Sequence, residues 1–489
     1  MKGRAIIPLL LVVVACGDPH THGTDPHALV DRDLDAITAD TLRVGVIEDA
    51  LTWEERTYGD AGLEWDLLTA FAEACHLPML PVPMDSLAQL HRALLSGEVD
   101  VIAAQLGGTR SHDDVIANTV PYAHVHPVVI LRRPMGSKGT MIPDTLLLPE
   151  PSPFSDDDLS GTHSFPRVQP ERTTHNAAQL FDHVVLGKSD AMIMTQLAAA
   201  RAMEQFPHLG GVAWNRVEVP LVFAVRANAP LFLAALNAHL SDERVKKTLA
   251  SELADLRFTE RIGPYGSKTP AVRGDTISGF DKLFRRVADS LGLDWHLLAA
   301  IAFRESRFDS TAGSRMGAQG LMQLMPATAA RFSGKEKPGV EGHVIGAAVY
   351  LRELDTLWQR SVPDVQQRQR FVLASYNAGE AHIQDAQRLA AHFGMRTDRW
   401  ENNVERALLL LACPRHWRKA PVRNGFCKGA ETFRYVRNVI GTWAYFGTVQ
   451  EEEALPDSLG RPSTPDTLAT PAGKQAKRDT TSVNAGTGG

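Results

Sequence analysis

Hydrophobic positions in the first half of the chain follow two spacings in turn, that of a strand and that of a helix. Residues 42–47 alternate as a strand, and residues 63–74 carry apolar side chains at the spacing of an amphipathic helix. Residues 94–104 then predict the end of a helix, a turn and a buried strand, and a related sequence returns at 185–194. Strands that alternate with helices predict an α/β module, and the two related sequences suggest two lobes within residues 40–256.

A further amphipathic helix, ending within residues 297–306, places a carboxylate among apolar side chains. Glu305 follows three apolar residues at helical spacings, namely Leu298, Ile301 and Ala302. A carboxyl group on such a face loses hydration, which disfavours its charged form and raises its pKa. The pattern therefore predicts a general acid that stays protonated near neutral pH. The alternative is a helix-end glutamate that pairs with a neighbouring arginine.

The first residues predict export. Two basic residues precede an apolar stretch that ends at Ala15 and is too short to span a bilayer, which indicates a signal peptide over residues 1–15. The Val-Val-Ala-Cys sequence at its end looks like a lipobox, so we expect a lipid anchor on Cys16 and a tether over residues 16–39. The alternative is a signal peptide with a chance cysteine. Gly17 favours the outer membrane of a Gram-negative envelope, with the protein facing the periplasm.

Composition sets the other boundaries. Glycine and proline mark a linker at 257–275, so a second module is expected at 276–448. Residues 449–489 are rich in Pro, Thr, Ser, Gly and Ala and are predicted to be disordered, because they cannot bury enough apolar surface to fold. The formal net charge of -6 over 489 residues, without basic tracts, argues against a nucleic-acid partner.

The chain has four cysteines, and one of them is the predicted lipid site. Cys413 and Cys427 flank a short basic loop and could form a disulfide in an oxidising periplasm, or remain free thiols. Cys75 would then be free. The spacing of the cysteines offers no zinc site, and no motif implies a metal or an organic cofactor.

Three blocks of sequence follow Glu305 in order. They are Gly317–Pro326, Ala374–Gly379 and Glu431–Val436. Together they resemble the goose-lysozyme-like catalytic domain of soluble-type lytic transglycosylases, which cleave bacterial peptidoglycan. The resemblance extends over about residues 280–447 and implies a mainly helical, lysozyme-like domain behind the two-lobed module.

The resemblance also implies a reaction for cell wall remodelling or turnover. Glu305 would protonate the glycosidic oxygen between N-acetylmuramic acid and N-acetylglucosamine and then act as base on the muramoyl C6 hydroxyl. That hydroxyl closes a 1,6-anhydro ring, so no second carboxylate is needed to activate water. Two alternatives remain. One is a lysozyme-like muramidase, for which Asp309 and Glu380 are the nearest second carboxylates, and the other is a ligand-sensing protein with a degenerate lytic domain.

Further site residues are implied by the same resemblance. Ser314 and Gln323 match positions that orient sugar near the acid, and Gly320 would permit close approach of the saccharide. Tyr376 matches a tyrosine whose hydroxyl approaches the catalytic carboxyl, and Asn377 offers an amide to an acetamido group. Met322 is either a groove residue or a core residue. His343 stands where family members usually have asparagine or serine.

The first module resembles bacterial solute-binding proteins of family 3, known as periplasmic amino-acid-binding proteins, over about residues 40–256. Those proteins carry an arginine three residues after a threonine to clamp a carboxylate. Here Thr109 is followed at once by Arg110, and His112 stands at the expected place. The Pro-rich stretch 143–166 looks like an insertion or an eroded lobe. We expect a regulatory module whose ligand is a muropeptide or resembles an amino acid.

Overall fold

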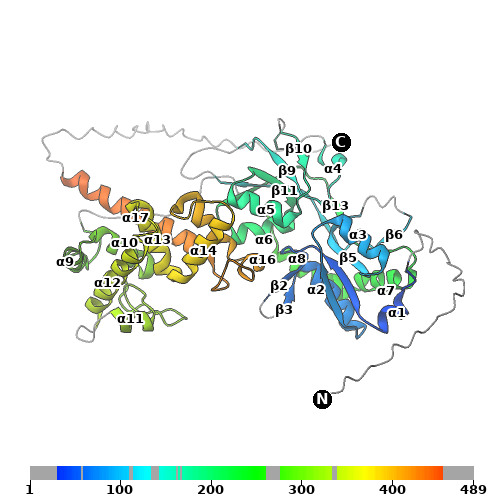
Figure 1. The fold of residues 1–489 in the computed structure, drawn as a ribbon, viewed down its shortest axis with the longest axis horizontal. Helices are drawn as coiled ribbons and strands as arrows, with labels where there is room; N and C mark the ends of the chain where they lie inside the picture. Colours follow the sequence, from blue (N-terminus) through cyan, green and yellow to red (C-terminus); the bar gives the residue numbers. More distant parts are fainter. Residues whose placement is uncertain are drawn as a thin grey trace, which may run out of the picture.

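The computed structural model describes residues 30–56, 59–108, 114–133, 142–160, 164–165, 168–259, 276–332 and 339–454. An α/β module occupies one end of an elongated molecule, and an all-helical domain occupies the other (Figure 1). The predicted fold class, a two-lobed α/β module followed by a helical domain, is confirmed.

The first lobe is built on a sheet with the strand order β4-β1-β5-β13-β6, and β7 also pairs with β13. Strands β4, β1 and β5 are parallel, whereas β13 is antiparallel to β5. The strands are β1 (Leu42–Val46), β4 (Met79–Pro83), β5 (Val101–Gly107), β6 (Ile116–Asn118), β7 (Ala123–Val125) and β13 (Val219–Arg226). The lobe also contains a hairpin of β2 (Glu54–Arg56) and β3 (Gly59–Ala61), and the helices α1 (Leu34–Thr38), α2 (Leu63–Ala74), α3 (Leu87–Ser96), α7 (Pro230–Ser241) and α8 (Glu243–Asp255).

The second lobe has a five-stranded sheet in the order β10-β9-β11-β8-β12. Its strands are β8 (Pro127–Arg132), β9 (Leu146–Leu148), β10 (Pro170–Arg172), β11 (Ala191–Thr195) and β12 (Leu209–Ala213). Its helices are α4 (Asp156–Leu159), α5 (Ala177–Leu186) and α6 (Gln196–Gln205). Strand β13 follows this lobe in sequence but returns to the first sheet, so the chain passes between the lobes twice.

The two related sequences within 94–104 and 185–194 share the pattern Gly-x-x-Asp, at residues 97–100 and 187–190. They lie at equivalent places in the two lobes. Helix α3 ends at Gly97 and α5 ends at Gly187, with φ angles of 76° and 81°, and each glycine is followed by a buried strand. Glycine adopts this left-handed conformation without the steric cost that a Cβ brings. The predicted helix, turn and strand are therefore confirmed in both lobes.

The Pro-rich stretch 143–166 is not an eroded part of the lobe. Leu146 and Leu148 are buried, and their strand β9 lies inside the second sheet between β10 and β11. The expectation of an eroded lobe was wrong, because a short leucine strand supplies core packing that the surrounding prolines concealed.

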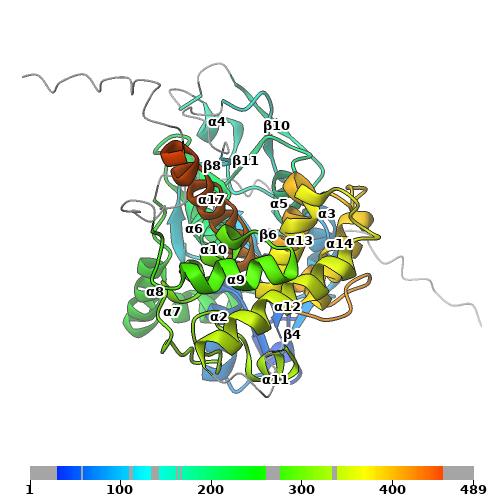
Figure 2. The ribbon, with the colours of Figure 1, turned by 90° about the vertical axis from the view of Figure 1, so that its left-hand side faces the viewer.

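The helical domain wraps its helices around a shared apolar core. It consists of α9 (Asp281–Leu291), α10 (Trp295–Ser306), α11 (Pro326–Phe332), α12 (Val340–Trp358), α13 (Val365–Ala378), α14 (Glu380–His392), a π-helical turn (Trp400–Val404), α15 (Glu405–Leu410), α16 (Pro414–Trp417) and α17 (Gly429–Ala454). Figure 2 looks onto this end and shows α9 beside α10 and α12, against which it packs, with α17 in red. Helix α17 packs against α10, α13 and α15, and it continues past the predicted end of the domain at residue 448.

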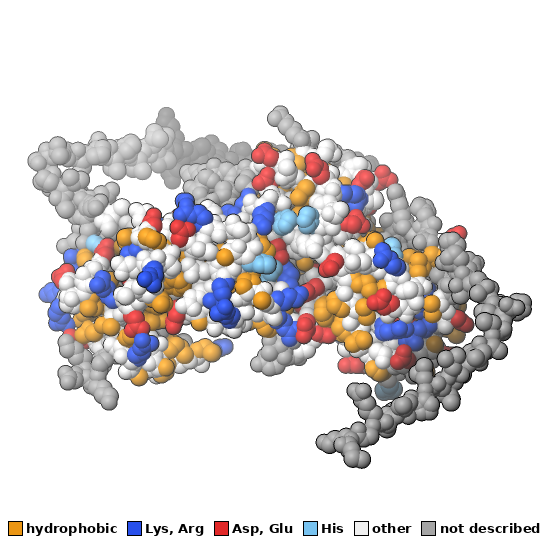
Figure 3. Space-filling view, viewed as in Figure 1, with side chains coloured by type: hydrophobic (Ala, Val, Ile, Leu, Met, Phe, Trp, Pro, Cys, Tyr) orange, Lys and Arg blue, Asp and Glu red, His pale blue; other side chains and the backbone are white. Residues whose placement is uncertain are grey.

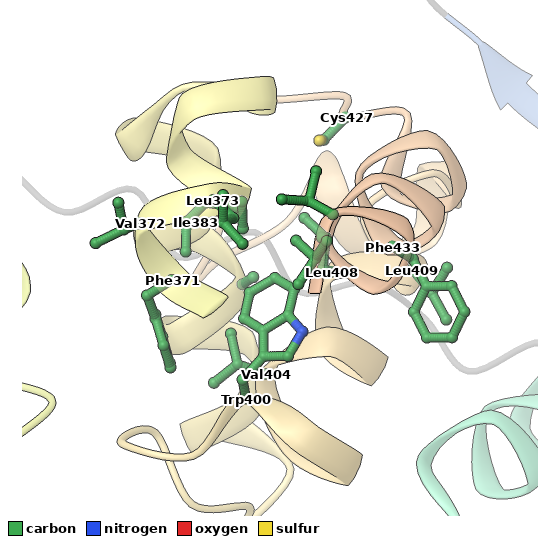
Figure 4. Close-up of a cluster of buried hydrophobic side chains, with 14 of the residues drawn as sticks. Phe371, Val372, Leu373, Ile383, Trp400, Val404, Leu408, Leu409, Cys427 and Phe433 are labelled. Carbon is green, nitrogen blue, oxygen red and sulfur yellow. The ribbon is translucent and has the colours of Figure 1, made fainter. Parts of the chain in front are cut away.

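Part of the core is drawn in Figure 4. The indole of Trp400 is 1% exposed, and its centroid lies 5.4 Å from that of Phe371. Val404 and Leu408 pack beside them. A single cluster of buried side chains continues from this core into the second lobe, through residues such as Leu180 of α5. The helical domain is thus packed onto the second lobe rather than only tethered to it.

Several sequence predictions lie outside the described residues. These include the signal peptide 1–15, Cys16, the clamp candidates Arg110 and His112, and nearly all of the predicted tail. Within the described ranges, no helix has the length and apolar content needed to cross a membrane. In that same part of the chain, no group of three or more His, Cys, Asp or Glu side chains is arranged to hold a metal ion.

Candidate active site

Glu305 lies in the last turn of α10, and the local sequence fixes that helix. The carboxylate of Asp294 accepts a hydrogen bond from the backbone N–H of His296 at 2.8 Å, which caps the first turn. Residues 297–302 are buried against neighbouring helices. Arg307, with φ 53°, ends the helix. The cap at Asp294, the buried face and the end at Arg307 together fix the position of Glu305 on α10.

The environment of Glu305 favours its protonated form. Burial raises the pKa of Glu305 to about 7; an interaction with the Tyr435 hydroxyl acts to lower it, and the charge of Glu431 raises it. Arg304, the adjacent arginine, donates instead to Thr442 at 2.7 Å. The raised pKa is the one expected from the apolar face of the helix.

Tyr435 on α17 is the phenol that faces the Glu305 carboxyl. Its hydroxyl is buried and makes no hydrogen bond of good geometry within the described residues, so the contact with Glu305 is a close approach rather than a well-aligned bond. Burial and the charge of Glu305 raise the pKa of Tyr435 well above its ordinary value. Sequence reasoning gave the corresponding role to Tyr376, although Tyr435 stood within the third sequence block.

Tyr376 on α13 also lies near the acid but has another partner. Its hydroxyl donates to the backbone oxygen of Met322 at 2.8 Å. Burial and the nearby charge of Glu305 raise the pKa of Tyr376 well above its ordinary value. Tyr376 therefore joins α13 to the loop that follows α10, while remaining within electrostatic range of Glu305.

That loop, residues 312–325, is pinned by its own side chains. Gln323 has a φ of 48°, and its side-chain nitrogen donates to the backbone oxygens of Ala312 and Gly320, both at 2.9 Å. The hydroxyl oxygen of Ser314 accepts from the backbone N–H of Ala318 at 2.9 Å. Ser314 remains exposed, whereas the amide donors of Gln323 are used to hold the loop.

The close packing of the His343 side chain requires glycine at position 320. The φ of Gly320 is 73°, and a Cβ at this position would lie 2.1 Å from Nδ1 of His343 on α12. Close packing against His343 is thus one reason for this glycine, and the close approach of the saccharide stays a prediction.

Two further predicted residues differ in exposure. Met322 has no exposed surface, so its side chain belongs to the core and cannot contact a substrate in this structure; the site uses only its backbone oxygen. This corrects its assignment as a substrate-binding residue. Asn377 is partly exposed, and its side-chain oxygen accepts from the hydroxyl of Thr432 at 2.7 Å. The bond orients the amide of Asn377 from α17.

The two carboxylates considered for a hydrolase have other partners. Asp309 accepts from the backbone and hydroxyl of Thr311, which lowers the pKa of Asp309. Glu380 interacts with Tyr350; burial and then the charge of Glu380 raise the pKa of Tyr350 to about 12. The carboxylate whose charge reaches Glu305 is instead the exposed Glu431, which sequence reasoning did not single out.

Of the two alternatives for Cys413 and Cys427, a disulfide or free thiols, the structure shows free thiols. Both thiols are buried, and Cys75 is also free. Burial raises the pKa of Cys413 to about 12 and that of Cys427 to about 11. The thiol of Cys413 lines a cavity between the lobes, whereas that of Cys427 lies at the edge of the helical core (Figure 4). The short separation in sequence did not reveal that the two thiols face different environments.

Two family models match separate parts of the chain. Residues 42–254 match the family described as bacterial extracellular solute-binding proteins, family 3, and residues 282–398 match the transglycosylase SLT domain. Among curated relatives, a protein of Maricaulis maris named membrane-bound lytic murein transglycosylase F is 31% identical over 89% of this chain and 96% of its own length. A protein of the same name from Shewanella oneidensis is 25% identical over 94% of this chain and 96% of its own length.

Solved structures with a similar fold are solute-binding proteins. The ancestral amino acid-binding protein AncCDT-1 is 21% identical, with a TM-score of 0.37, over 45% of this chain and 97% of its own length. A mutant of the arginine-binding protein ArgBP from T. maritima is 20% identical, with a TM-score of 0.37, over 45% of this chain and 95% of its own length.

Proposed function

We propose that the single carboxyl of Glu305 carries the reaction of this protein. The chain belongs to the family of membrane-bound lytic murein transglycosylase F and is a peptidoglycan lytic transglycosylase. The bond cleaved is the one between N-acetylmuramic acid and N-acetylglucosamine. The cleavage is non-hydrolytic and leaves a 1,6-anhydromuramoyl end. The observation that carries this proposal is the place of the Glu305 carboxyl, in the last turn of α10 beside the Tyr435 hydroxyl, where burial raises its pKa to about 7.

In the first step Glu305 acts as a general acid. A carboxyl whose pKa is raised to about 7 keeps a protonated population near neutral pH, and such a pKa suits proton transfer under these conditions. The proton passes to the glycosidic oxygen, and the bond to the anomeric carbon of the muramoyl residue breaks. Glu305 is left as a carboxylate, with the phenol of Tyr435 beside it.

In the second step the same carboxylate acts as a base. It removes the proton of the muramoyl C6 hydroxyl, and the oxygen bonds to the anomeric carbon of the same sugar. An intramolecular nucleophile has a high effective concentration, so this reaction does not require a second carboxylate to position water. Asp309 and Glu380, engaged with Thr311 and Tyr350, make the hydrolytic alternative less favoured.

Sugar contacts are proposed for two exposed or partly exposed side chains. The hydroxyl of Ser314 and the amide nitrogen of Asn377 are proposed to bind acetamido groups, since their oxygens already accept bonds from the protein. Gln323 acts mainly by shaping the loop, because its amide nitrogen holds two backbone oxygens.

The test is the product released from purified sacculi by the Glu305→Gln variant. This change keeps the shape of the side chain but removes the proton that is transferred. We expect the release of anhydromuropeptides, measured by mass spectrometry, to fall by a factor of about 10³ or more.

The matched control is Glu380→Gln, which changes a carboxylate assigned to no chemical step. It should release the same anhydro products at a rate within about twofold of the original protein. Products with reducing ends from the original protein, or unchanged activity of Glu305→Gln, would contradict the proposal.

Its relatives are named membrane-bound lytic murein transglycosylase F, which supports a membrane-associated enzyme of the cell envelope. We propose that removal of residues 1–15 leaves a lipid on Cys16 and that this lipid anchors the protein to the outer membrane, facing the periplasm. The N-terminal module is proposed to bind a muropeptide or an amino-acid-like ligand and to regulate the lytic domain. The two-lobed fold supports this role, since such lobes close around ligands by hinge motion.

A further inference from the structure

A short segment of the helical domain binds both lobes of the N-terminal module. We call residues 413–419, which include α16, the clasp segment. Arg418 forms an ion pair of 2.6 Å with Glu55 of the first lobe, and Lys419 lies 3.8 Å from Glu48. Charged side chains of both signs gather at this junction in Figure 3. The clasp segment and both lobes together line the mouth of the cleft between the lobes.

Arg415 of the clasp segment reaches from the mouth into the cleft. Its Nη2 lies 2.5 Å from Oδ1 of Asp182 on α5, and Nε2 of His416 lies 2.8 Å from the other oxygen of Asp182. The side chain of Arg415 is 14% exposed and that of Asp182 is 11% exposed. A guanidinium supplied by one domain is thus bound by a carboxylate inside the other.

The cavity around Arg415 suits a positive group. Asp49 and Glu54 of the first lobe line the same cavity as Arg415. The charges of Asp182 and Glu54 raise the pKa of Arg415, opposing the effect of its burial. The apolar part of the wall comes from both lobes and includes Leu51 of the first and Phe181 of the second. A hydrocarbon stem with a cationic end matches such a surface.

Deeper in the cleft, hydrogen bonds hold the carboxyl of Asp49 and oppose the effect of burial, which raises its pKa. Asp49 accepts from the backbone N–H groups of Leu51 and Thr52, both at 2.8 Å, and from the side chain of Gln105. Thr195 of the second lobe donates to the same Gln105 at 3.1 Å. These hydrogen bonds link the acidic wall to both lobes.

A second cation lines the cavity, Arg201 of α6, whose charge also acts on Glu252 of α8. The Nε of Arg201 is buried without a hydrogen-bond partner among the described residues. Because Arg415 occupies the acidic end, the space that remains is only about 80 Å³. An amino acid with a charged side chain would need the volume that Arg415 now fills.

We propose that this cleft binds a ligand with a guanidinium or ammonium group on a hydrocarbon stem, and that Arg415 is an internal competitor for the same site. The inference rests on the proposed ligand-binding role of the N-terminal module and adds the chemical class of the ligand. The ligand's cationic end takes the place of the Arg415 guanidinium beside Asp182 and Glu54. A carboxylate on the ligand pairs with Arg201.

The experiment measures binding of L-arginine to the full chain by isothermal titration calorimetry. Arg415→Ala removes the competitor, and we expect it to bind L-arginine at least about tenfold more tightly than the original protein does. L-citrulline, which has the same shape without the charge, should bind Arg415→Ala at least about tenfold more weakly than L-arginine.

The matched control is Arg418→Ala, which removes a neighbouring arginine of the clasp segment that lies outside the cavity. Its affinity for L-arginine should stay within about twofold of the original protein. If Arg415→Ala does not fold, as judged by circular dichroism, Arg415→Gln replaces it under the same expectations.

Three results would overturn the inference: no gain in affinity on removal of Arg415, equal binding of L-citrulline and L-arginine, or the same gain with Arg418→Ala. Because the readout is binding, it is independent of anhydromuropeptide release. Failure here with intact lytic activity would refute the cationic ligand and leave the proposed reaction standing.

Discussion

The chemistry of Glu305 depends on what surrounds one carboxyl group. Burial raises its pKa to about 7, and the Tyr435 hydroxyl opposes part of that rise. A carboxyl in this state can both give and take a proton near neutral pH, which a carboxyl of ordinary pKa does poorly. The phenol of Tyr435 therefore limits how far the pKa of Glu305 rises above its ordinary value.

Replacing Tyr435 with phenylalanine should move the pH dependence of the reaction upward. The phenol stabilises the charged carboxylate, so its loss raises the pKa of Glu305, and the basic limb of the pH profile shifts to higher pH. We also expect the maximal rate to fall about tenfold or more. Rates of anhydromuropeptide release between pH 5 and about 9 measure both effects.

Tyr376→Phe is the control for this prediction. It removes the hydrogen bond to the backbone oxygen of Met322 and leaves the contact between Tyr435 and Glu305 in place. Its basic limb should stay where it is in the original protein. A profile for Tyr435→Phe that is lowered but not shifted would show that the phenol does not tune the acid.

At the scale of elements, the site depends on how α10, α12, α13 and the loop 312–325 hold one another. The loop is tied to α13 through Tyr376 and packs against α12 through His343. Gly320 is the position where that packing leaves no room, since its backbone is left-handed and a Cβ would meet the imidazole.

Gly320→Ala should destabilise the helical domain by about 3 kcal/mol, because backbone strain and overpacking act together. Gly317→Ala is the matched control: its φ of 91° brings similar strain, but its Cβ would lie 3.9 Å from the nearest atom. We expect about 1–2 kcal/mol for this control. Urea unfolding monitored by circular dichroism measures both changes.

The double variant Gly320→Ala/His343→Ala separates the effect of backbone strain from that of overpacking. Removing the imidazole should recover the part of the loss that comes from overpacking, leaving a value close to that of Gly317→Ala. Equal losses for the two single variants would mean that His343 does not restrict the loop.

At the scale of the molecule, the helical domain and the second lobe share a buried ion pair and a continuous core. Burial alone would raise the pKa of Asp182, but the charges of Arg415 and His416 lower it to about 2. A carboxyl whose folded pKa is lowered stabilises the fold at every pH above its ordinary value of 3.8, and this contribution is lost as the pH falls toward 2.

Asp182→Asn should therefore destabilise the docked pair of modules by about 2–4 kcal/mol at pH 7. The difference from the original protein should shrink as the pH falls from 3.8 toward 2. Differential scanning calorimetry measures this difference in stability and reveals whether the modules begin to unfold separately.

The control is Glu55→Gln, which breaks an ion pair whose carboxylate is 59% exposed. It should lower the stability by less than about 0.5 kcal/mol. Equal effects of the two variants would contradict a role for burial at this interface.

The sequence by itself determined the local features. The helix at 63–74, the glycine turns after α3 and α5, and the apolar face that carries Glu305 all follow from spacing and from the conformational freedom of glycine. Each of these depends on residues within one or two turns or strands. The order of the three sequence blocks was also sufficient to indicate the enzyme class.

Only the tertiary structure decided which distant groups meet. Tyr435 faces Glu305 because α17 packs against α10, and Arg415 enters the cleft because the helical core continues into the second lobe. The same packing separates the environments of Cys413 and Cys427 and buries the side chain of Met322. Periodicity reports which face of an element is apolar, but the partner of that face is chosen by packing among elements far apart in the chain.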